Sequence, residues 1–477
     1  MSTLPSIAII GGGFSGAAVA YHLAERSAVA TLSVFEPRAT LGAGLAYGTS
    51  DPEHRINVPS AKMSLVPDDD RHFIDWISRT NATSDDPEAL AEDGQIYARR
   101  SVFGRYVHEY LKPWLANGRI AHVRARAKSI ERSDDRWRIE TDTGLSAFAD
   151  VVVLATTHPS PNVPAVLARG LRGDRRLVAN SDDAQALGHI EPDARVTIIG
   201  SGLTMADVVA SLDRRGHRGP ITAISRRGLL PRGHAPQLYQ TFGEFVRTPP
   251  LSTVQLLREI RLTIEQARAL DVPWQAVIDA VRAQASIFWP KMPIEERSRL
   301  VRHLRPYWDV HRFRIAPQIE SILERRKSEG TFEVHAGNVC GTEAFDDHIL
   351  LHVLGRGEKS PTFRETDYVV ITTGPAHGRI IDTEPHLSSL AAKGWIKADS
   401  LGLGILCNEQ GRAIAPSGGA VESLLIAGPL ARGTFGELMG LPQVTSYAQA
   451  IANEVLQQLA SRRHYRSAAS ELVAKAN

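Results

Sequence analysis

Cysteine is nearly absent from this chain. Its 477 residues include only Cys340 and Cys407, which lie far apart and form no C-x-x-C arrangement. A disulfide framework is therefore excluded, and a reducing cytoplasm fits the composition. The same scarcity excludes the disulfide reductases that depend on a paired redox-active cysteine motif.

Long apolar runs and an excess of one charge are also lacking. No apolar run approaches the roughly 20 residues that a membrane helix needs, and Met1–Pro5 has no basic region or cleavage site of a signal peptide. The net charge of +2 gives no nucleic-acid footprint, and 43% hydrophobic with 23% charged residues is typical of a soluble globular protein. We therefore expect a cytoplasmic protein with no membrane or nucleic-acid partner. The length predicts two or three domains.

Glycine is concentrated in two short motifs. The first follows the apolar run Ser6–Ile10, which predicts a buried parallel strand, and it precedes the helix-forming segment Ala17–Arg26. It reads G-x-G-x-x-G and comprises Gly11, Gly12, Gly13, Phe14, Ser15 and Gly16. In such a motif the first glycine permits a tight turn, the second lets the backbone approach a pyrophosphate, and the third lets the helix pack closely. The helix N-terminus then offers free N–H groups to the phosphates.

An acidic residue ends the next predicted strand. Thr31–Phe35 is followed by Glu36, twenty residues after Gly16. A carboxylate at this place can hold ribose hydroxyls and would repel a 2′-phosphate. The unit therefore predicts a bound dinucleotide. The spacing alone leaves FAD and NAD open, and a glycine-rich turn without a ligand is the alternative.

The second motif has the same layout with a different ending. A predicted strand, Arg195–Ile199, leads through a glycine turn into the predicted helix Leu203–Arg214, and Ala206 replaces the third glycine. The next predicted strand, Ile221–Ile224, ends without an acid. Instead it is followed by a hydroxyl and two guanidinium groups, which suit a 2′-phosphate. We therefore predict NADPH here, with a solvated basic loop as the alternative. The predicted contacts are Gly200, Gly202, Leu203, Thr204, Ser225, Arg226 and Arg227.

Further segments carry a family resemblance. They are Gly44-Leu45-Ala46-Tyr47-Gly48, Asn57-Val58-Pro59, Arg100 to Tyr106, Ser225-Arg226-Arg227-Gly228 and Gly428-Pro429-Leu430 to Gln443. Over nearly its whole length the chain resembles a bacterial family of FAD/NAD(P)-binding oxidoreductases, distantly related to flavin-dependent N-hydroxylating monooxygenases. The resemblance implies that the first motif holds FAD. Pro429 replaces an aspartate of many relatives, so that contact must come from elsewhere.

The cofactor contacts expected beyond the first motif come from several loops. A glycine-rich loop at Gly44 would pass close to a flat ring, and the strand before Gly428 is of the sort that ends against a flavin. Pro442 suits the first turn of a helix whose dipole would stabilise a reduced, anionic flavin, and a plain terminal helix is the alternative. The full set is Gly44, Leu45, Asn57, Val58, Met63, Gly374, Gly428 and Pro442.

These patterns predict an α/β fold with two Rossmann-type dinucleotide-binding domains. The NAD(P)-binding domain is expected to be inserted in the FAD-binding domain. Residues 1–165 and 366–477 would form the FAD-binding domain, and residues 190–365 the NAD(P)-binding domain with a helical insertion at about 250–327.

The second half of this insertion mixes arginine, histidine and aromatic residues between Arg302 and Arg314. On a continuous helix, Trp308, His311, Arg312 and Ile315 would share one face. Such a face could hold an anionic small-molecule substrate. The candidates for contact or acid–base chemistry are His311, Arg312 and Arg305. Salt bridges that join the insertion to the nucleotide-binding domains are the alternative.

The predicted chemistry is hydride transfer from NADPH to FAD. In the leading hypothesis the reduced flavin takes up oxygen as a C4a-hydroperoxide and oxygenates a small substrate, such as an amine or an amino acid. One alternative is an NAD(P)H-dependent reductase or dehydrogenase that inserts no oxygen. Another is a non-catalytic, nucleotide-binding redox sensor. No metal site is predicted.

Overall fold

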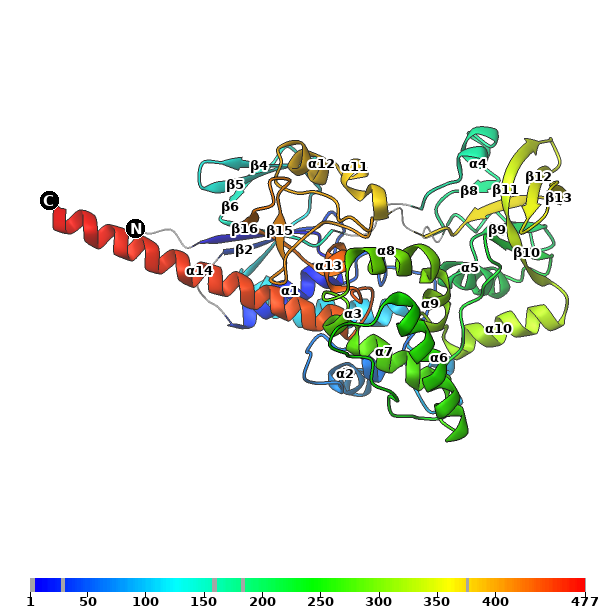
Figure 1. The fold of residues 1–477 in the computed structure, drawn as a ribbon. Helices are drawn as coiled ribbons and strands as arrows, with labels where there is room; N and C mark the ends of the chain where they lie inside the picture. Colours follow the sequence, from blue (N-terminus) through cyan, green and yellow to red (C-terminus); the bar gives the residue numbers. More distant parts are fainter. Residues whose placement is uncertain (1–4, 27–30, 157–160, 182–184, 375–376, 477) are drawn as a thin grey trace.

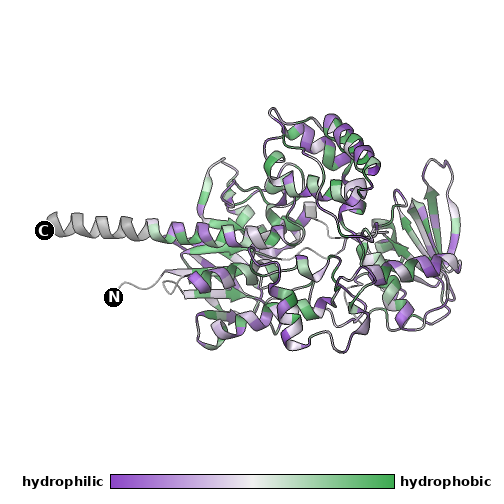
Figure 2. Ribbon diagram, turned by 90° about the horizontal axis from the view of Figure 1, so that it is seen from below, coloured by the Kyte–Doolittle hydropathy of each residue, from purple (hydrophilic) through white to green (hydrophobic). Residues whose placement is uncertain are grey.

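The computed structural model of the chain describes residues 5–26, 31–156, 161–181, 185–374 and 377–476, with side chains as far as residue 461. Two largely parallel sheets lie at opposite ends of the main body, and a group of helices lies beside them (Figure 1). Apolar residues, green in Figure 2, concentrate on the strands of both sheets. This is the two-domain dinucleotide-binding fold that the sequence predicts.

The first sheet has the strand order β15-β16-β7-β1-β2-β3. All neighbours pair in parallel except the edge strand β15, which is antiparallel to β16. The strands are β1 (Ser6–Ile10), β2 (Thr31–Phe35), β3 (Ile120–Val123), β7 (Val151–Leu154), β15 (Arg412–Ile414) and β16 (Ala420–Ile426). The sheet thus combines the N-terminal third of the chain with a segment more than 250 residues later.

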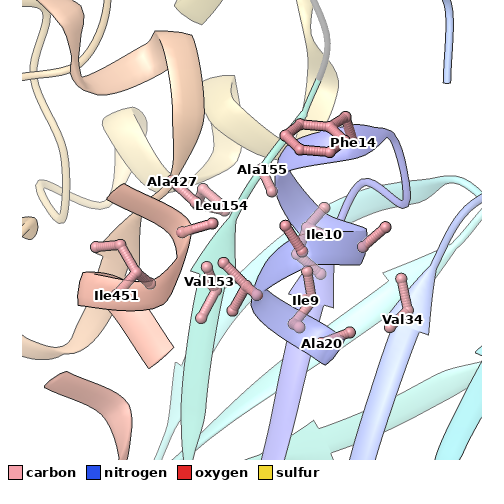
Figure 3. Packing of buried hydrophobic residues seen from close by; sticks show 14 of the residues in the cluster. Ile9, Ile10, Phe14, Ala20, Val34, Val153, Leu154, Ala155, Ala427 and Ile451 are labelled. Carbon is pink, nitrogen blue, oxygen red and sulfur yellow. The ribbon is translucent and has the colours of Figure 1, made fainter. Parts of the chain in front are cut away.

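The core of this sheet consists of short aliphatic runs that are buried on both faces. Ile9, Val34 and Val153 are completely buried where β1, β2 and β7 meet (Figure 3). Two helices cover one face, α1 (Phe14–Arg26) and α14 (Gln443–Ala476), and they pack against each other. The C-terminal part of α14 extends past the rest of the protein (Figure 1).

The second sheet has the strand order β13-β12-β11-β10-β9-β14-β8. The five strands from β11 to β8 are parallel, and β12 and β13 add an antiparallel edge. Helix α5 (Leu203–Arg214) connects β9 to β10. The strands are β8 (Leu177–Val178), β9 (Val196–Ile199), β10 (Ile221–Ser225), β11 (Phe332–Ala344), β12 (Ile349–Gly355), β13 (Thr362–Thr366) and β14 (Tyr368–Ile371).

Strand β14 corrects one expected boundary. A division at residue 366 would assign this strand to the FAD-binding domain, but β14 lies between β9 and β8 in the second sheet. Its residues Tyr368–Ile371 pair in parallel with Val196–Ile199. The reason is that a buried parallel strand takes the sheet whose neighbours complete its hydrogen bonds. The crossing between the two sheets therefore follows Ile371.

The remaining elements of the first domain surround its sheet. An antiparallel sheet of β4 (Ala127–Ser133), β5 (Arg136–Thr141) and β6 (Ser146–Ala149) packs against α12 (Pro385–Ala392). By contrast, helix α4 (Ala165–Gly170) lies beside β11 and belongs to the second domain. The other helices are α2 (His72–Thr80), α3 (Arg100–Ala116), α11 (Ile380–Thr383), α13 (Arg432–Phe435) and the 3₁₀ turns η1 (Ser60–Lys62), η2 (Pro87–Ala89), η3 (His377–Arg379) and η4 (Gly428–Ala431).

The part of the segment between β10 and β11 that runs from Thr253 to Ser328 is helical, as its sequence pattern predicts. It has a small apolar core of its own around Val277, Phe288 and Trp289. Its helices are α6 (Thr253–Ala269), α7 (Trp274–Phe288), α8 (Ile294–His303), α9 (Arg305–Arg312) and α10 (Pro317–Ser328). Within the described part of the chain, none of the helices combines the length and apolar character of a membrane span.

Candidate functional site: two dinucleotide-binding turns

The first glycine motif forms the turn between β1 and α1. Gly11 has a φ of +102°, and a Cβ there would lie 2.5 Å from the carbonyl oxygen of Ala155. A Cβ on Gly16 would lie 1.9 Å from the carbonyl oxygen of Gly11. Both positions therefore require glycine, because a side chain would collide with backbone. The turn brings the N-terminus of α1 to the carboxyl edge of the first sheet, where a phosphate would meet free N–H groups.

A cavity opens over this turn, and Glu36 lines it from the tip of β2. The Glu36 carboxylate is almost fully buried. Its Oε2 accepts a hydrogen bond from the N–H of Gly12 at 3.0 Å, and its Oε1 accepts from the N–H and the guanidinium of Arg38 at 3.1 and 3.0 Å. Each carboxylate oxygen can accept two hydrogen bonds. The group is thus fixed in place and Oε2 can still accept from a ribose hydroxyl.

The structure brings several of the predicted FAD contacts to this cavity and leaves others away from it. Pro429 also lines it. A Cβ on Gly428 would lie 2.3 Å from the hydroxyl of Ser15, so this glycine lets η4 pack against the turn. The predicted residues on the cavity wall are Gly11, Gly13, Phe14, Ser15, Glu36, Gly44 and Leu45.

Seven predicted FAD contacts do not line the cavity: Gly16, Asn57, Val58, Met63, Gly374, Gly428 and Pro442. The carbonyl of Asn57 accepts a hydrogen bond from His234 at 3.1 Å. Val58 and Met63 belong to the core around the first sheet, and Gly374 lies in the crossing after β14. Pro442 immediately precedes α14, and its neighbours Leu441 and Val444 line the cavity.

Other cavity residues escaped the sequence analysis. Arg126, Glu384 and His386 come from segments without a motif, so no sequence signal points to them. His386 is almost fully buried, and neither ring nitrogen has a hydrogen-bond partner among the described residues. Burial, aided by the charge of Arg126, lowers the pKa of His386 to about 4, and burial raises the pKa of Glu384. The imidazole is therefore neutral at physiological pH.

The second glycine motif forms the turn between β9 and α5. Gly200 has a φ of +122°, and a Cβ there would lie 2.5 Å from the carbonyl oxygen of Thr372. Gly202 is different, because no atom lies within 4 Å of its Cβ position. Open space therefore borders the N-terminus of α5, which begins at Leu203 and Thr204. This is the arrangement in which a backbone can approach a pyrophosphate.

The residues at the tip of β10 have unequal roles. The Ser225 hydroxyl accepts hydrogen bonds from Ser201 at 2.7 Å and from the N–H of Gly228 at 3.1 Å, so it shapes the turn. Arg227 stacks over the ring of Tyr307, 4.9 Å from its centroid, and donates to the carbonyl of His303. Arg226 is exposed and has no hydrogen-bond or ion-pair partner within the described ranges. The guanidinium of Arg226, unlike that of Arg227, is therefore available to bind a phosphate.

We predict that Arg226→Ala raises the Michaelis constant for NADPH about 10-fold or more, because a charge-assisted hydrogen bond to the 2′-phosphate is lost. The Michaelis constant for NADH should be nearly unchanged. Arg227→Ala should have a smaller selective effect, because this side chain is also held by the insertion. Steady-state reduction with both nicotinamides checks this. An equal rise for both cofactors would contradict a 2′-phosphate contact.

The arginine-rich segment departs from the expected continuous face. Helix α9 ends at Arg312, so Ile315 lies in the following loop and does not extend the face of Trp308. The Nδ1 of His311 lies 2.7 Å from the carbonyl of Tyr307, and its ring packs on Trp274. The helix ends here because Phe313 has non-helical dihedral angles and Pro317 begins α10. These contacts hold His311 against α7 of the same insertion.

The other two candidates form ion pairs. Arg305 lies 3.4 Å from Asp309 within α9. Arg312 is buried and donates through Nε to Glu437 at 2.9 Å, and Trp308 donates to the same carboxylate at 2.8 Å. These contacts join the insertion to the loop before α14. They match the salt-bridge alternative for Arg312, and they place it near the cavity wall at Gly440.

Polar contacts also connect the first domain to α5. Arg100, at the start of α3, forms an ion pair with Asp207 at 2.8 Å, and Glu53 pairs with Arg214 at 2.8 Å. The hydroxyl of Ser211 lies 3.2 Å from Nε2 of His54. Because these contacts lie along one face of α5, they hold the second turn in one orientation relative to the first domain.

The two cysteines lie in different parts of the fold. Cys340 is exposed on β11, in the second sheet. Cys407 is buried near β15, and burial raises the pKa of its thiol to about 11. A buried, protonated thiol is a poor nucleophile. The fold therefore brings no dithiol to either glycine turn.

The residues present fit two dinucleotides. The glycine turns leave room for a backbone approach, and each is followed by a helix N-terminus. The buried carboxylate of Glu36 lies beside the first turn. Glu36 and the turn at Gly11–Gly16 would hold FAD. The turn at Gly200–Gly202 with Arg226 would hold the nicotinamide dinucleotide.

Comparison with known proteins agrees with this geometry. Residues 8–159 match a family described as FAD-NAD(P)-binding, which confirms the resemblance to FAD/NAD(P)-binding oxidoreductases. No curated protein matches the chain.

Solved structures share the fold at low sequence identity. An ornithine hydroxylase from Pseudomonas aeruginosa is 17% identical with a TM-score of 0.65, covering 96% of this chain and 99% of its own. The ornithine N-hydroxylase of Kutzneria sp. 744, with reduced FAD, NADP+ and L-ornithine, is 15% identical with a TM-score of 0.65, covering 97% and 100%. A bacillithiol disulfide reductase from Bacillus cereus is 16% identical with a TM-score of 0.53, covering 96% and 99%. The chain thus has the fold of flavoproteins with two dinucleotide-binding domains.

Proposed function

We propose that this flavoprotein is an NADPH-dependent monooxygenase that uses FAD to oxygenate a small amine or amino acid. The observation that carries the proposal is the pair of unequal dinucleotide turns, held in one orientation by the contacts along α5, in a chain without a dithiol. Electrons that enter from NADPH then have no protein thiol pair to receive them.

FAD, when bound, would supply the redox chemistry that links the nicotinamide to dioxygen. The protein's part is to bind, orient and shield. Glu36 and the α1 N-terminus would hold the adenosine diphosphate part of FAD, and the α5 N-terminus would hold the second dinucleotide. The N-terminus of α14 begins beside the cavity, where its dipole favours negative charge that develops on a reduced ring.

The low-identity relatives support an amine or amino-acid substrate. Two are named for the hydroxylation of ornithine, and one from Pseudomonas syringae is named L-lysine 6-monooxygenase. The disulfide reductases that share the fold are a weaker guide, because Cys407 is buried with a raised pKa and Cys340 lies alone on β11. A thiol-free reductase is the rival function.

We expect the purified yellow protein to oxidise NADPH faster when a member of a panel of amines and amino acids is present, with oxygenated product formed in step with NADPH consumption. Mass spectrometry of the product and a peroxide assay give the coupling. NADPH oxidation that no panel member accelerates, with peroxide as the product, would favour the rival reductase. Failure of NADPH and NADH to bleach the flavin would leave only a non-catalytic role.

A further inference from the structure

One arginine beside the cofactor cavity has no carboxylate partner among the residues that the structure describes. Arg282, on α7, donates hydrogen bonds to the carbonyl of Leu441 and the side-chain oxygen of Gln443, both neutral groups. Its Nε is buried without a partner among the described residues, and the structure shows no hydrogen bond from its Nη1. Burial lowers the pKa of Arg282 to about 9; the charges of Arg312 and Arg314 act in the same direction, and those of Glu437 and Asp279 oppose it.

The nearby carboxylates are already engaged. Asp279, one turn before Arg282 on α7, accepts from Arg314 at 2.7 Å and from Tyr239 at 2.9 Å. Glu437 accepts from Arg312 and Trp308. Each acid therefore neutralises another arginine. The guanidinium of Arg282 lies among these pairs as the surplus positive charge.

A second cation lies close to this surplus. Lys62 extends from η1, and its Nζ lies 5.9 Å from the centroid of the Tyr239 ring. Part of the Lys62 side chain is exposed to solvent, but the protein around its ammonium group lowers the pKa by burial. The charges of Arg314 and Arg282 also lower this pKa, whereas those of Asp279 and the exposed Asp70 raise it. An ammonium group that is both solvent-accessible and desolvated is recessed in the surface. Within the described residues no carboxylate forms an ion pair with it.

This surplus charge lies next to the cofactor cavity. Leu441, whose carbonyl accepts from Arg282, lines that cavity with Gly440. Arg282 itself is not on the cavity wall, so it lies one residue behind the wall, on the side of the helical insertion. An anion held there would be adjacent to the cofactor without competing for its site.

We propose that Arg282, together with Lys62, binds a carboxylate on the end of the substrate that is not oxidised. A substrate carboxylate would complete the charge balance that the protein leaves open, through a bidentate contact with the guanidinium. The substrate class is therefore an acid-bearing molecule rather than a simple diamine. The inference rests on the proposed function where it calls the bound molecule a substrate. The binding of an anion can be tested without turnover.

The test compares two probes of equal carbon chain, glutarate and 1,5-diaminopentane, titrated against the FAD-loaded protein by flavin absorbance and thermal shift. Glutarate is expected to bind the wild type more tightly than the diamine. Arg282→Gln should weaken glutarate binding about 10- to 100-fold, the value of a charge-assisted hydrogen bond pair, and Arg282→Lys should recover part of it. FAD content and NADP+ affinity should be unchanged. The matched control is Arg258→Gln, an exposed arginine on α6 of the same insertion.

The outcomes separate the possible sources of the anion. An equal loss in Arg258→Gln, or no glutarate binding by the wild type, would overturn the proposal. A loss of NADP+ affinity in Arg282→Gln would assign the arginine to a dinucleotide phosphate, and a shifted flavin reduction potential with unchanged glutarate binding would assign it to the reduced ring. If no panel compound is oxygenated but glutarate binding still depends on Arg282, the proposed monooxygenase fails and the anion site stands.

Discussion

Replacing Gly202 by alanine should strongly slow the reduction of the flavin by sub-saturating NADPH while leaving the folded protein and its FAD intact. Gly202 has an ordinary φ of −91°, and no atom lies within 4 Å of its Cβ position, so a methyl group costs the empty fold little. In the complex, that methyl would occupy the space through which the backbone approaches the pyrophosphate. Overpacking a tight contact costs about 1–3 kcal/mol, so we expect NADP+ affinity to fall up to about 100-fold.

Isothermal titration of NADP+ and the FAD content of the purified variant measure the two halves of this prediction. The matched comparison is Gly200→Ala, two residues away. Its φ of +122° and the 2.5 Å approach of its Cβ to the Thr372 carbonyl predict loss of folded protein rather than selective loss of binding. Equal NADP+ affinity in Gly202→Ala and wild type would mean that no dinucleotide crosses this turn.

The second large effect concerns the buried ion pair of Arg55 and Asp86. The two side chains are 1% and 2% exposed, and the guanidinium donates to both carboxylate oxygens at 2.7 and 2.8 Å. Arg55→Met leaves the Asp86 carboxylate buried without its main partner, which costs about 3–5 kcal/mol. We expect the free energy of unfolding in urea to fall by that amount.

A matched surface pair controls for the loss of an ion pair as such. Arg71 and Asp75 pair at 2.8 Å with side chains 76% and 59% exposed, so Arg71→Met should change the stability by less than about 1 kcal/mol. The double variant Arg55→Met/Asp86→Leu should recover much of the lost stability, because no charge is then left buried. Similar losses in Arg55→Met and Arg71→Met would show that burial does not set the cost.

Local patterns in the sequence were sufficient for both dinucleotide turns. The predicted strands Ser6–Ile10 and Thr31–Phe35 and the helix Leu203–Arg214 have these bounds in the structure. They were predictable because apolar runs, glycine spacing and the following helix all act over a few neighbouring residues. Glu36 follows the same local logic, since it ends the strand next to the first turn.

Contacts between distant segments were beyond the sequence. His386 reaches the cofactor cavity only because α12 packs against the antiparallel sheet. Strand β14 joined the second sheet, against the expected boundary, because its hydrogen-bond partners are there. The role of Arg312 depended on Glu437, more than a hundred residues later, which no spacing rule connects to it.

The sequence by itself determined where the two glycine turns of a dinucleotide-binding fold lie, that an acid follows one turn and arginines follow the other, and that the chain has no C-x-x-C pair. These properties depend on the types of residues that are close together in the sequence, and they do not require knowledge of which distant segments come into contact. The tertiary structure decided which charges are left over. Arg282, unremarked in the sequence, became the uncompensated cation only when Asp279 and Glu437 were taken by other arginines. Charge balance in a fold is a sum over neighbours, and neighbours are a property of the packed chain.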